Sequence, residues 1–463
     1  MRGSIRAALL LLAAFPPVCA WAQLSVPPPQ DTGATRTVYV RLASNANAIL
    51  VEPVRPDPVR SHIAILVTHP EHQNNFDYFI GPALARYGYR VMLLNYYGRE
   101  QSYYEFLTPI AQAIRALRSL PGVRKVVLAG HSTGGAELTS YEVVAENGPK
   151  ACQQAVRISK CDSRGLENLP KADGMMLLDS NSGAPERTIS LEPGIDPRHP
   201  NRRDPSLNIF NPANGYDPAT GAAHYSAAFL RKYFAAQRAR ADGLIDEALG
   251  RLSKIEKGQG DFKDDEPFVV AGVSRYMSAG RPDLTDGLLM SRTRAPHLLL
   301  KADGTRPVQI IPLVRTPQGS PRQDDMLFET TENTTVRSYL SFQALRVSPD
   351  YRIARDRITG LQWCSTPNSI QCNLAGIRVP TLVMSATCAP HLVLLETAYY
   401  RSAARDKTFV GDEGADHGFL PCKPKYGDTF KRAFDYVDGW LLAPGRFLDA
   451  RRTEPVRASA SAP

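Results

Sequence analysis

The stretch Lys125-Val-Val-Leu-Ala-Gly-His-Ser-Thr-Gly134 decides how this chain folds. Its first five residues favour a strand, and the last five carry glycine at positions 130 and 134 around Ser132. This order predicts a buried strand that breaks into a tight turn, followed by a helix from about Ala136. Glycine two residues before and two after the serine permits strained backbone angles, so we expect the serine hydroxyl to stand exposed at the apex of the turn.

Such a turn is a nucleophile elbow, and it makes Ser132 the candidate nucleophile. The helix that follows would point its positive end at the serine and stabilise an anion formed there. A glycine-rich turn with a serine of no chemical role is the simpler alternative. The position of the turn between a strand-type run and a helix-compatible segment favours the elbow.

A serine hydroxyl needs a base within hydrogen-bonding reach, and the chain has nine histidines. His417 lies in Gly414-Ala-Asp-His-Gly-Phe419, between a short strand and the last helix of the chain. A parallel sheet would bring this loop beside the elbow, so His417 is the predicted base. His391 is a less favoured substitute, and His131 should point away from the apex.

Apolar runs alternate with helical patterns on both sides of the elbow, which predicts a mostly parallel sheet flanked by helices, an α/β fold. The predicted strands are 37–42, 48–54, 62–68, 90–95, 125–129, 174–178, 379–384 and 408–410, and the predicted helices are 76–87, 104–120, 392–404 and 429–442.

The alternation stops after Asp179 and resumes near residue 377. The residues between contain Pro/Gly/Asn-rich stretches, a long amphipathic helix over Ser226–Ile255, a hairpin around Asp303-Gly304 and a helix over 335–347. The predicted organisation is one catalytic domain with a large lid. Its parts are a signal peptide 1–22, a leader 23–36, core 37–180, a lid or cap insertion 181–376, core 377–445 and a flexible tail 446–463.

The chain resembles the α/β-hydrolase superfamily, on the residues Gly130–Gly134 and Gly414–Phe419 and on the order serine, acid, histidine. The resemblance is to secreted bacterial-type serine esterases and lipase-like hydrolases. It implies an eight-stranded, mostly parallel sheet, a Ser-His-acid triad, and a cap inserted after the sixth strand, where the break after Asp179 falls.

The acid departs from that pattern. The superfamily usually places an aspartate just after the seventh strand, but Ser385–Pro390 contains no carboxylate. Some lipases of the superfamily use an aspartate at the end of the sixth strand, and Leu178-Asp179-Ser180 resembles that arrangement. Asp179 is therefore the favoured acid, which would orient His417. Glu396 is the main alternative, and three further carboxylates stay open: Asp412, Glu413 and Asp416.

An oxyanion formed during attack needs two backbone donors. The N–H of Thr133 is one, and Glu71 is the predicted second by position, because Pro70 has no N–H. The spacing of His69 and His72 could instead suggest a metal pair, but no third ligand lies nearby. We expect no metal and no cofactor.

The N-terminus has the parts of a secretory signal. Arg2 and Arg6 precede an apolar run over 7–15, and Ala20-Trp-Ala22 forms a cleavage site. A lipid anchor at Cys19 is disfavoured because Pro16-Pro17-Val18 lacks small residues. The run is too short to cross a bilayer, so we expect a secreted or periplasmic protein with no integral membrane contact.

Seven cysteines, less Cys19 in the signal, leave six, which suits an oxidising compartment. Their spacing favours the pairs Cys152–Cys161, Cys364–Cys372 and Cys388–Cys422, although other pairings and free thiols stay open. The third pair would join the two loops beside His417. The absence of a Cys-x-x-Cys motif disfavours a zinc site.

The formal net charge of +9 would fall to +7 without Arg2 and Arg6, and the excess is scattered. No basic helix or motif indicates a nucleic-acid partner. The sequence does not reveal the oligomeric state. The predicted activity is hydrolysis of small-molecule or polymeric carboxylic esters through an acyl-enzyme on Ser132. Amide hydrolysis or peptidase activity, acyl transfer, and a non-catalytic binding role are the alternatives.

Overall fold

The computed structural model describes residues 35–42, 46–69, 74–96, 102–196, 199, 202–273, 281–314 and 331–448. The predicted signal peptide, nearly all of the leader, Glu71, His72 and the tail beyond residue 448 lie outside these residues.

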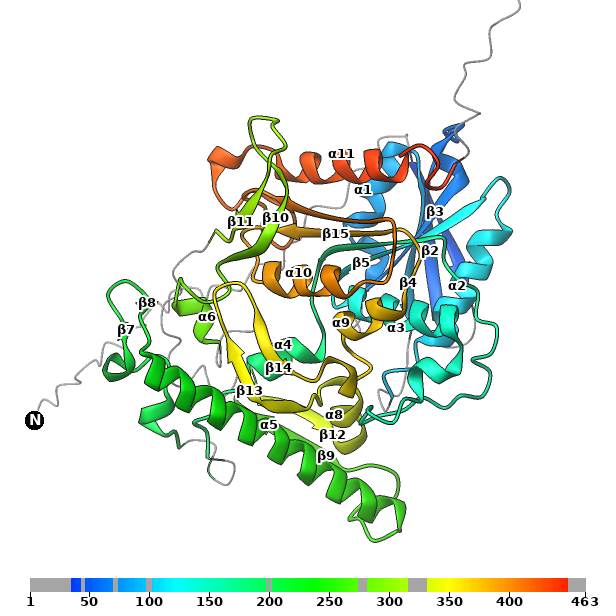
Figure 1. The fold of residues 1–463 in the computed structure, drawn as a ribbon. Coiled ribbons are helices and arrows are strands. Elements are labelled where there is room, and N and C mark those ends of the chain that lie inside the picture. The colour runs from blue at the N-terminus through cyan, green and yellow to red at the C-terminus, as the bar shows by residue number, and fades with distance from the viewer. Residues whose placement is uncertain are drawn as a thin grey trace, which may run out of the picture.

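Within the described residues, one sheet of ten strands forms the centre of the molecule (Figure 1). The strands from β4 to β10 run parallel, and antiparallel pairs close both edges. This is the mixed, mostly parallel sheet of an α/β-hydrolase fold. In spatial order the strands are β1 (Thr35–Arg41), β2 (Ala46–Pro53), β4 (Arg90–Tyr96), β3 (Ile63–Thr68), β5 (Lys125–Ser132), β6 (Gly174–Ser180), β15 (Thr381–Ala386), β16 (Lys407–Asp412), β10 (Arg292–Leu300) and β11 (Val308–Pro312).

The predicted count of eight strands is wrong by two, because the hairpin β10–β11 extends the sheet. Leu298 pairs with Val410 and Leu300 with Asp412, in parallel with β16. Without β10, one side of β16 would leave its backbone N–H and C=O groups unpaired. The apolar run at the end of β10 completes that edge, so part of the segment predicted as a lid belongs to the sheet.

Helices cover both faces of the sheet (Figure 1). Helices α1 (Ile80–Tyr87) and α11 (Thr429–Leu441) pack on one face with alternate strand residues such as Ile65 and Val67. The other face holds Leu66 and three helices: α2 (Leu107–Ser119), α3 (Gly134–Asn147) and α10 (Leu392–Arg401). Because β3 is buried on both faces, its sequence is continuously apolar instead of alternating.

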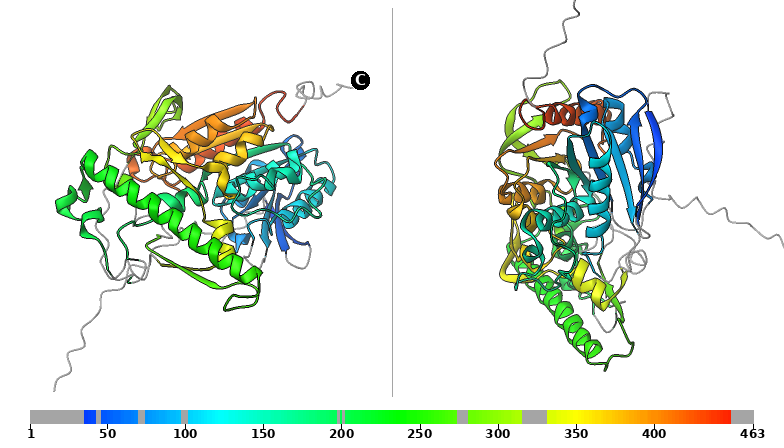
Figure 2. Two further views of the ribbon diagram at one scale, coloured as in Figure 1. Left: turned by 60° about the horizontal axis from the view of Figure 1, so that its bottom comes forward. Right: turned by 90° about the vertical axis from the view of Figure 1, so that its right-hand side faces the viewer.

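The rest of the insertion forms a second layer below α3 and α10 in Figure 1, and Figure 2 shows the long helix α5 running along its outer side. It has an apolar core of its own, to which α10 contributes Val393 and Leu394. Its elements are α4 (Ala184–Ile189), β7 (Tyr216–Asp217), β8 (Ala222–Ala223), α5 (Ala227–Glu256), β9 (Pro267–Ala271), α6 (Pro282–Thr285), β12 (Thr331–Thr335), α8 (Val336–Phe342), β13 (Val347–Ile353), β14 (Ile358–Leu361) and α9 (Ile370–Asn373).

Of the two helices predicted in the insertion, one has the expected bounds within a residue and the other is shorter than predicted. Helix α5 begins as expected, because the Ser226 side chain accepts a hydrogen bond from the N–H of Phe229 and caps the first turn. Helix α8 ends at Phe342, earlier than predicted, and β13 begins at Val347. Val347 is already paired with Leu361 of β14, so the chain has to leave the helix before that residue.

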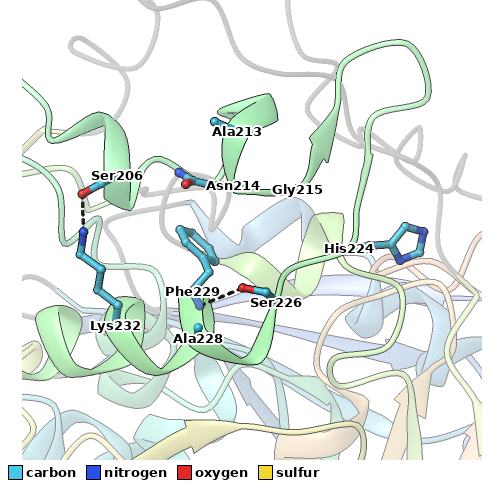
Figure 3. Close-up of a pocket in the computed structure, with 9 residues that line it drawn as sticks. All are labelled: Ser206, Ala213, Asn214, Gly215, His224, Ser226, Ala228, Phe229 and Lys232. Carbon is cyan, nitrogen blue, oxygen red and sulfur yellow. Dashed lines mark hydrogen bonds between the residues drawn. The ribbon is translucent and has the colours of Figure 1, made fainter.

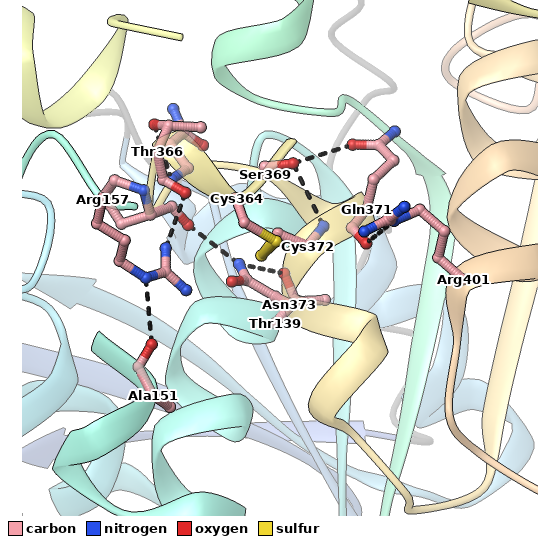
Figure 4. Close-up of a disulfide and its surroundings, with 12 residues drawn as sticks. Thr139, Ala151, Arg157, Cys364, Thr366, Ser369, Gln371, Cys372, Asn373 and Arg401 are labelled. Carbon is pink, nitrogen blue, oxygen red and sulfur yellow. Dashed lines mark hydrogen bonds between the residues drawn. A yellow bond between two sulfur atoms is a disulfide. The ribbon is translucent and has the colours of Figure 1, made fainter. Parts of the chain in front are cut away.

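Among the described residues, the six cysteines form the disulfides Cys152–Cys161, Cys364–Cys372 and Cys388–Cys422, the pairs that their spacing favours. Around Cys364–Cys372 the end of the insertion is bonded to the core (Figure 4). The Asn373 side chain donates to Thr139 on α3 at 3.4 Å, and the Arg157 guanidinium donates to the carbonyls of Ala151 and Thr366. The insertion is thereby fastened directly behind the helix that follows the elbow.

None of the helices in the described part of the chain combines the length and the apolar character needed to cross a membrane.

Candidate active site

Ser132 is the last residue of β5 and has a φ of 52°, an uncommon left-handed conformation for a residue with a side chain. The glycines around it are required by close contacts. A Cβ on Gly134 would lie 2.1 Å from the carbonyl oxygen of Thr68, and a Cβ on Gly130 would lie 2.4 Å from Cα of Gly135. The backbone can therefore turn sharply at the serine and enter α3 directly, the geometry of a nucleophile elbow.

Asp179 lies on the neighbouring strand β6 at an irregularity in the strand pairing. His131 pairs with Leu178 while Ser132 pairs with Ser180, so Asp179 is an extra residue in the ladder, with a φ of 43°. A bulge of this kind turns a side chain away from its regular direction. The fully buried Asp179 carboxylate accepts a hydrogen bond from the N–H of Ala386 at 2.9 Å through Oδ1. Its other oxygen, Oδ2, lies 2.7 Å from Nδ1 of His417.

His417 lies in the loop after β16, and its side chain is 36% exposed. The loop is fixed from both ends. The Asp416 carboxylate accepts from the N–H groups of Gly418 and Leu420, and the disulfide Cys388–Cys422 joins the loop to the segment after β15. Backbone hydrogen bonds from Cys388 to Ala415 and from Cys422 to Gly414 accompany the disulfide. The imidazole is thus presented partly to solvent on a restrained loop.

His131, next to the nucleophile, links three loops of the site. Its Nε2 lies 2.6 Å from the carbonyl oxygen of His417, and its Nδ1 is hydrogen-bonded to the Tyr78 hydroxyl. Burial lowers the pKa of His131 well below its usual value, and nearby His417 adds to the effect, so the ring is neutral. A carbonyl can only accept, so Nε2 carries the proton and Nδ1 accepts from Tyr78. The sequence prediction that this side chain points away from the apex gave no hint of this link.

The other candidate carboxylates bond elsewhere. Glu396 accepts from the backbone N–H groups of Arg294 and Ala295 and lies 2.8 Å from Nε2 of His297. Asp412 pairs with Arg432 at 2.6 Å, and burial raises its pKa to about 7. Asp416 bonds to the backbone of its own loop. For Glu413 the structure records a backbone carbonyl bonded to Arg432.

His391 lies close behind the Asp179–His417 pair, with its ring centroid 5.1 Å from that of His417. Its Nδ1 is 3.1 Å from Oε1 of Glu186, and both side chains are buried. Asp179, His391 and His417 offer three ligand atoms within 4.8 Å of one another. A metal ion there would have to break the 2.7 Å hydrogen bond between Asp179 and His417, so the arrangement suits an acid and a base better than a metal site.

The oxyanion donors are only partly within the described residues. Thr133 lies directly after the serine at the start of α3, and its side chain makes no capping hydrogen bond. Glu71 lies outside the described residues, but both ends of its loop are anchored. The Asn75 side chain donates to the carbonyls of His69 at 3.1 Å and Leu94 at 2.8 Å. Glu71 therefore remains a prediction.

A hollow of about 480 Å³ lies elsewhere, between the start of α5 and the loop before β7 (Figure 3). Phe229 and Lys232 line it from α5, and Lys232 donates a hydrogen bond to Ser206 across it. None of the residues that line it is Ser132, Asp179 or His417. The hollow is a feature of the insertion surface, not of the candidate active site.

No protein-family model matches the chain. No curated protein matches it either. Similar solved structures include a hypothetical protein from Pseudomonas aeruginosa, 14% identical, covering 93% of this chain and 99% of its own, with a TM-score of 0.43. Est1E from Butyrivibrio proteoclasticus is 10% identical, covering 88% and 97%, with a TM-score of 0.37. The siderophore hydrolase EstB from Aspergillus fumigatus is 11% identical, covering 89% and 98%, with a TM-score of 0.41. Likenesses at this level of identity concern the fold alone.

Proposed function

We propose that this protein is a secreted serine hydrolase that cleaves carboxylic esters, with Ser132 as nucleophile, His417 as general base and Asp179 as the acid. The observation that carries the proposal is the 2.7 Å contact between Asp179 Oδ2 and His417 Nδ1. Asp179 lies on the strand next to that of Ser132, which has a φ of 52°. Asp179 and His417 form a base-and-orienter pair of the kind that activates a serine in unrelated hydrolases.

In the proposed triad, this contact favours the tautomer of His417 that has its proton on Nδ1. Because Nδ1 donates to Asp179, Nε2 is left as the basic nitrogen. It takes the proton of Ser132 as the Oγ–acyl carbon bond forms, and it returns that proton to the alcohol oxygen as the ester bond breaks. Water then attacks the acyl-enzyme by the same proton path and releases the acid. The N–H of Thr133 would stabilise the oxyanion, with Glu71 as the proposed second donor.

Export is part of the same proposal. It rests on the signal-type N-terminus and on the six mature cysteines, all of which are paired among the described residues. Disulfides persist in the periplasm or outside the cell, where such an enzyme would meet small-molecule or polymeric esters. Cleavage after Ala22 would be visible as the mass and N-terminal sequence of the exported protein.

Turnover of p-nitrophenyl esters of graded acyl length tests the activity, with Ser132→Ala as the matched variant. Wild type should turn over at least one ester and react with a fluorophosphonate probe. Ser132→Ala should lose about a thousandfold or more in kcat/KM and all probe labelling, because the covalent step is gone. Equal activity of the two proteins would disprove the assignment of the nucleophile.

Two further arms separate the alternatives that use the same three residues. Matched p-nitroanilides would reveal an amidase. Added alcohols would reveal an acyltransferase, because they would divert the acyl group from water to a new ester. A wild type that is folded but neither labelled nor active would favour a binding protein.

A further inference from the structure

A buried chain of charged side chains reaches the candidate triad from the insertion. The Arg281 guanidinium contacts the Asp283 carboxylate at 2.7 Å and Glu186 at 2.9 Å, and Glu186 contacts His391 at 3.1 Å. All four side chains are at most 1% exposed. Glu186 belongs to α4 and Asp283 to α6, both in the insertion, whereas His391 is the residue that precedes α10 of the core.

The negative charges of this buried network and of neighbouring Asp179 outnumber its one certain positive charge. Among the described residues of this network, Asp179, Glu186 and Asp283 supply three buried carboxylates, and Arg281 supplies one guanidinium. An uncompensated carboxylate is costly in the protein interior. His391 stands between two of the three. It is 3.1 Å from Glu186, and one of its ring nitrogens is within 4.8 Å of a carboxylate oxygen of Asp179.

We propose that His391 is a positively charged positioning residue that offsets the excess negative charge beside Asp179 and so keeps His417 available as a base at neutral pH. This inference rests on the proposed function. Burial opposes the charge on His391, but Asp179 and Glu186 outweigh burial and the repulsion from Arg281, and they raise its pKa. Two titratable rings lie near His391: the neutral His131, and His417, which has to be neutral before it can accept the serine proton. The Asp416 carboxylate also faces Asp179 and His417, and it accepts hydrogen bonds from the N–H groups of Gly418 and Leu420.

The role of His391 follows from its distance to His417. Without a charge on His391, the carboxylates of Asp179 and Glu186 would favour the protonated form of His417, which cannot act as a base. With the charge present, Asp179, Glu186, Asp283, Arg281 and His391 together carry a single excess negative charge. The imidazolium formed on His417 during attack neutralises it. Through Glu186 and Arg281 the insertion would then contribute to the electrostatic environment of His417.

The test is the pH dependence of kcat/KM for His391→Gln, Glu186→Gln and the double variant, with His297→Gln as a matched control. His297 also forms a buried pair with a glutamate, Glu396, but it packs among Tyr399, Tyr400 and Phe409. In His391→Gln the acid limb of the profile should move to higher pH by about one unit, because a positive charge near His417 is lost.

The double variant loses one positive and one negative charge together, so its acid limb should return toward that of wild type. His297→Gln should leave the limb where it is. A merely structural role for His391 would lower kcat without moving the limb and would make the double variant worse than either single one. An unmoved limb in His391→Gln, or a limb that moves to lower pH, would overturn the proposal.

A readout that needs no activity separates this inference from the proposed function. In Ser132→Ala protein labelled with ¹⁵N-histidine, the signals lost in His391→Gln identify this ring. Both of its nitrogens should carry protons at pH 7. A neutral His391 would overturn the inference even in an active enzyme. If wild type proves inactive on every ester while His391 is charged, only the proposed function fails.

Discussion

The carboxyl edge of the sheet and the insertion contribute to the candidate site in different ways. The sheet supplies the candidate nucleophile, acid and base from the ends of β5, β6 and β16, where backbone geometry fixes their positions. The insertion supplies none of these three. It brings buried charges, Glu186 and Arg281, up against His391 behind them. One region thus sets where the candidate catalytic groups lie, and the other places buried charges behind them.

The largest loss of activity should come from a substitution in the sheet. Asp179→Asn keeps the shape of the side chain but removes the negative charge that orients His417, so kcat/KM for an ester substrate should fall by about a thousandfold to ten-thousandfold. The matched variant Glu396→Gln changes a carboxylate that bonds to the start of β10, and it should keep activity per folded molecule. Ester hydrolysis by purified, folded protein checks both. The reverse result would make Glu396 the acid.

The insertion should show its largest effect in stability. Arg281→Met leaves Glu186 and Asp283 buried without their shared cation, and the free energy of unfolding should fall by about 3 to 5 kcal/mol. Arg164→Met is the control, because Arg164 forms its ion pair with Asp162 while 89% exposed. Denaturant unfolding of that control should match wild type. Equal losses in both variants would mean that burial of the network contributes nothing.

A glycine-to-alanine substitution should change stability in opposite directions in the two regions. Gly134→Ala places a Cβ 2.1 Å from the Thr68 carbonyl oxygen, so it should cost about 1 to 3 kcal/mol of stability and displace the elbow. Gly243→Ala lies within α5 with no atom near its added Cβ, and it should gain about 0.5 to 1 kcal/mol. Thermal unfolding of both variants measures the contrast. Stabilisation by Gly134→Ala would contradict the tight elbow.

The smallest expected effect is on the pH dependence of stability, through His131, which links the elbow to the His417 loop. The folded pKa of His131 is lowered, so below about pH 6.5 the unfolded chain binds a proton that the folded protein does not. Stability from this group is therefore present above that pH and is lost as the pH falls. His131→Gln can keep a donor to His417 and an acceptor for Tyr78 without titrating.

The free energy of unfolding of wild type should consequently fall more steeply than that of His131→Gln below pH 6.5, by up to about 1.4 kcal/mol per pH unit. Urea unfolding at several pH values between 5 and 7.5 measures the two slopes. Parallel slopes would show that His131 is protonated in the folded protein or does not contribute to the linkage.

Prediction from the sequence was most accurate where the pattern is local. The strands around the elbow, the helix after it and the capped start of α5 follow from apolar runs, glycine spacing and a capping serine. The expectation for β10 and β11 was right as a hairpin and wrong as part of the lid, because strand partners are chosen by distant chain segments. The early end of α8 was missed because it depends on the pairing of Val347 with Leu361, a contact between strands that no local pattern shows.

The sequence by itself determined the elbow, because glycine spacing and an apolar strand act within ten residues of chain. It also narrowed the acid to a few carboxylates. Only the tertiary structure brings one of them, Asp179, against His417, since the bulge that turns its side chain depends on the register between β5 and β6. The same holds for Glu186, Arg281 and His391. Their charges meet only when the insertion packs on the core, and no local pattern records an interaction that burial creates.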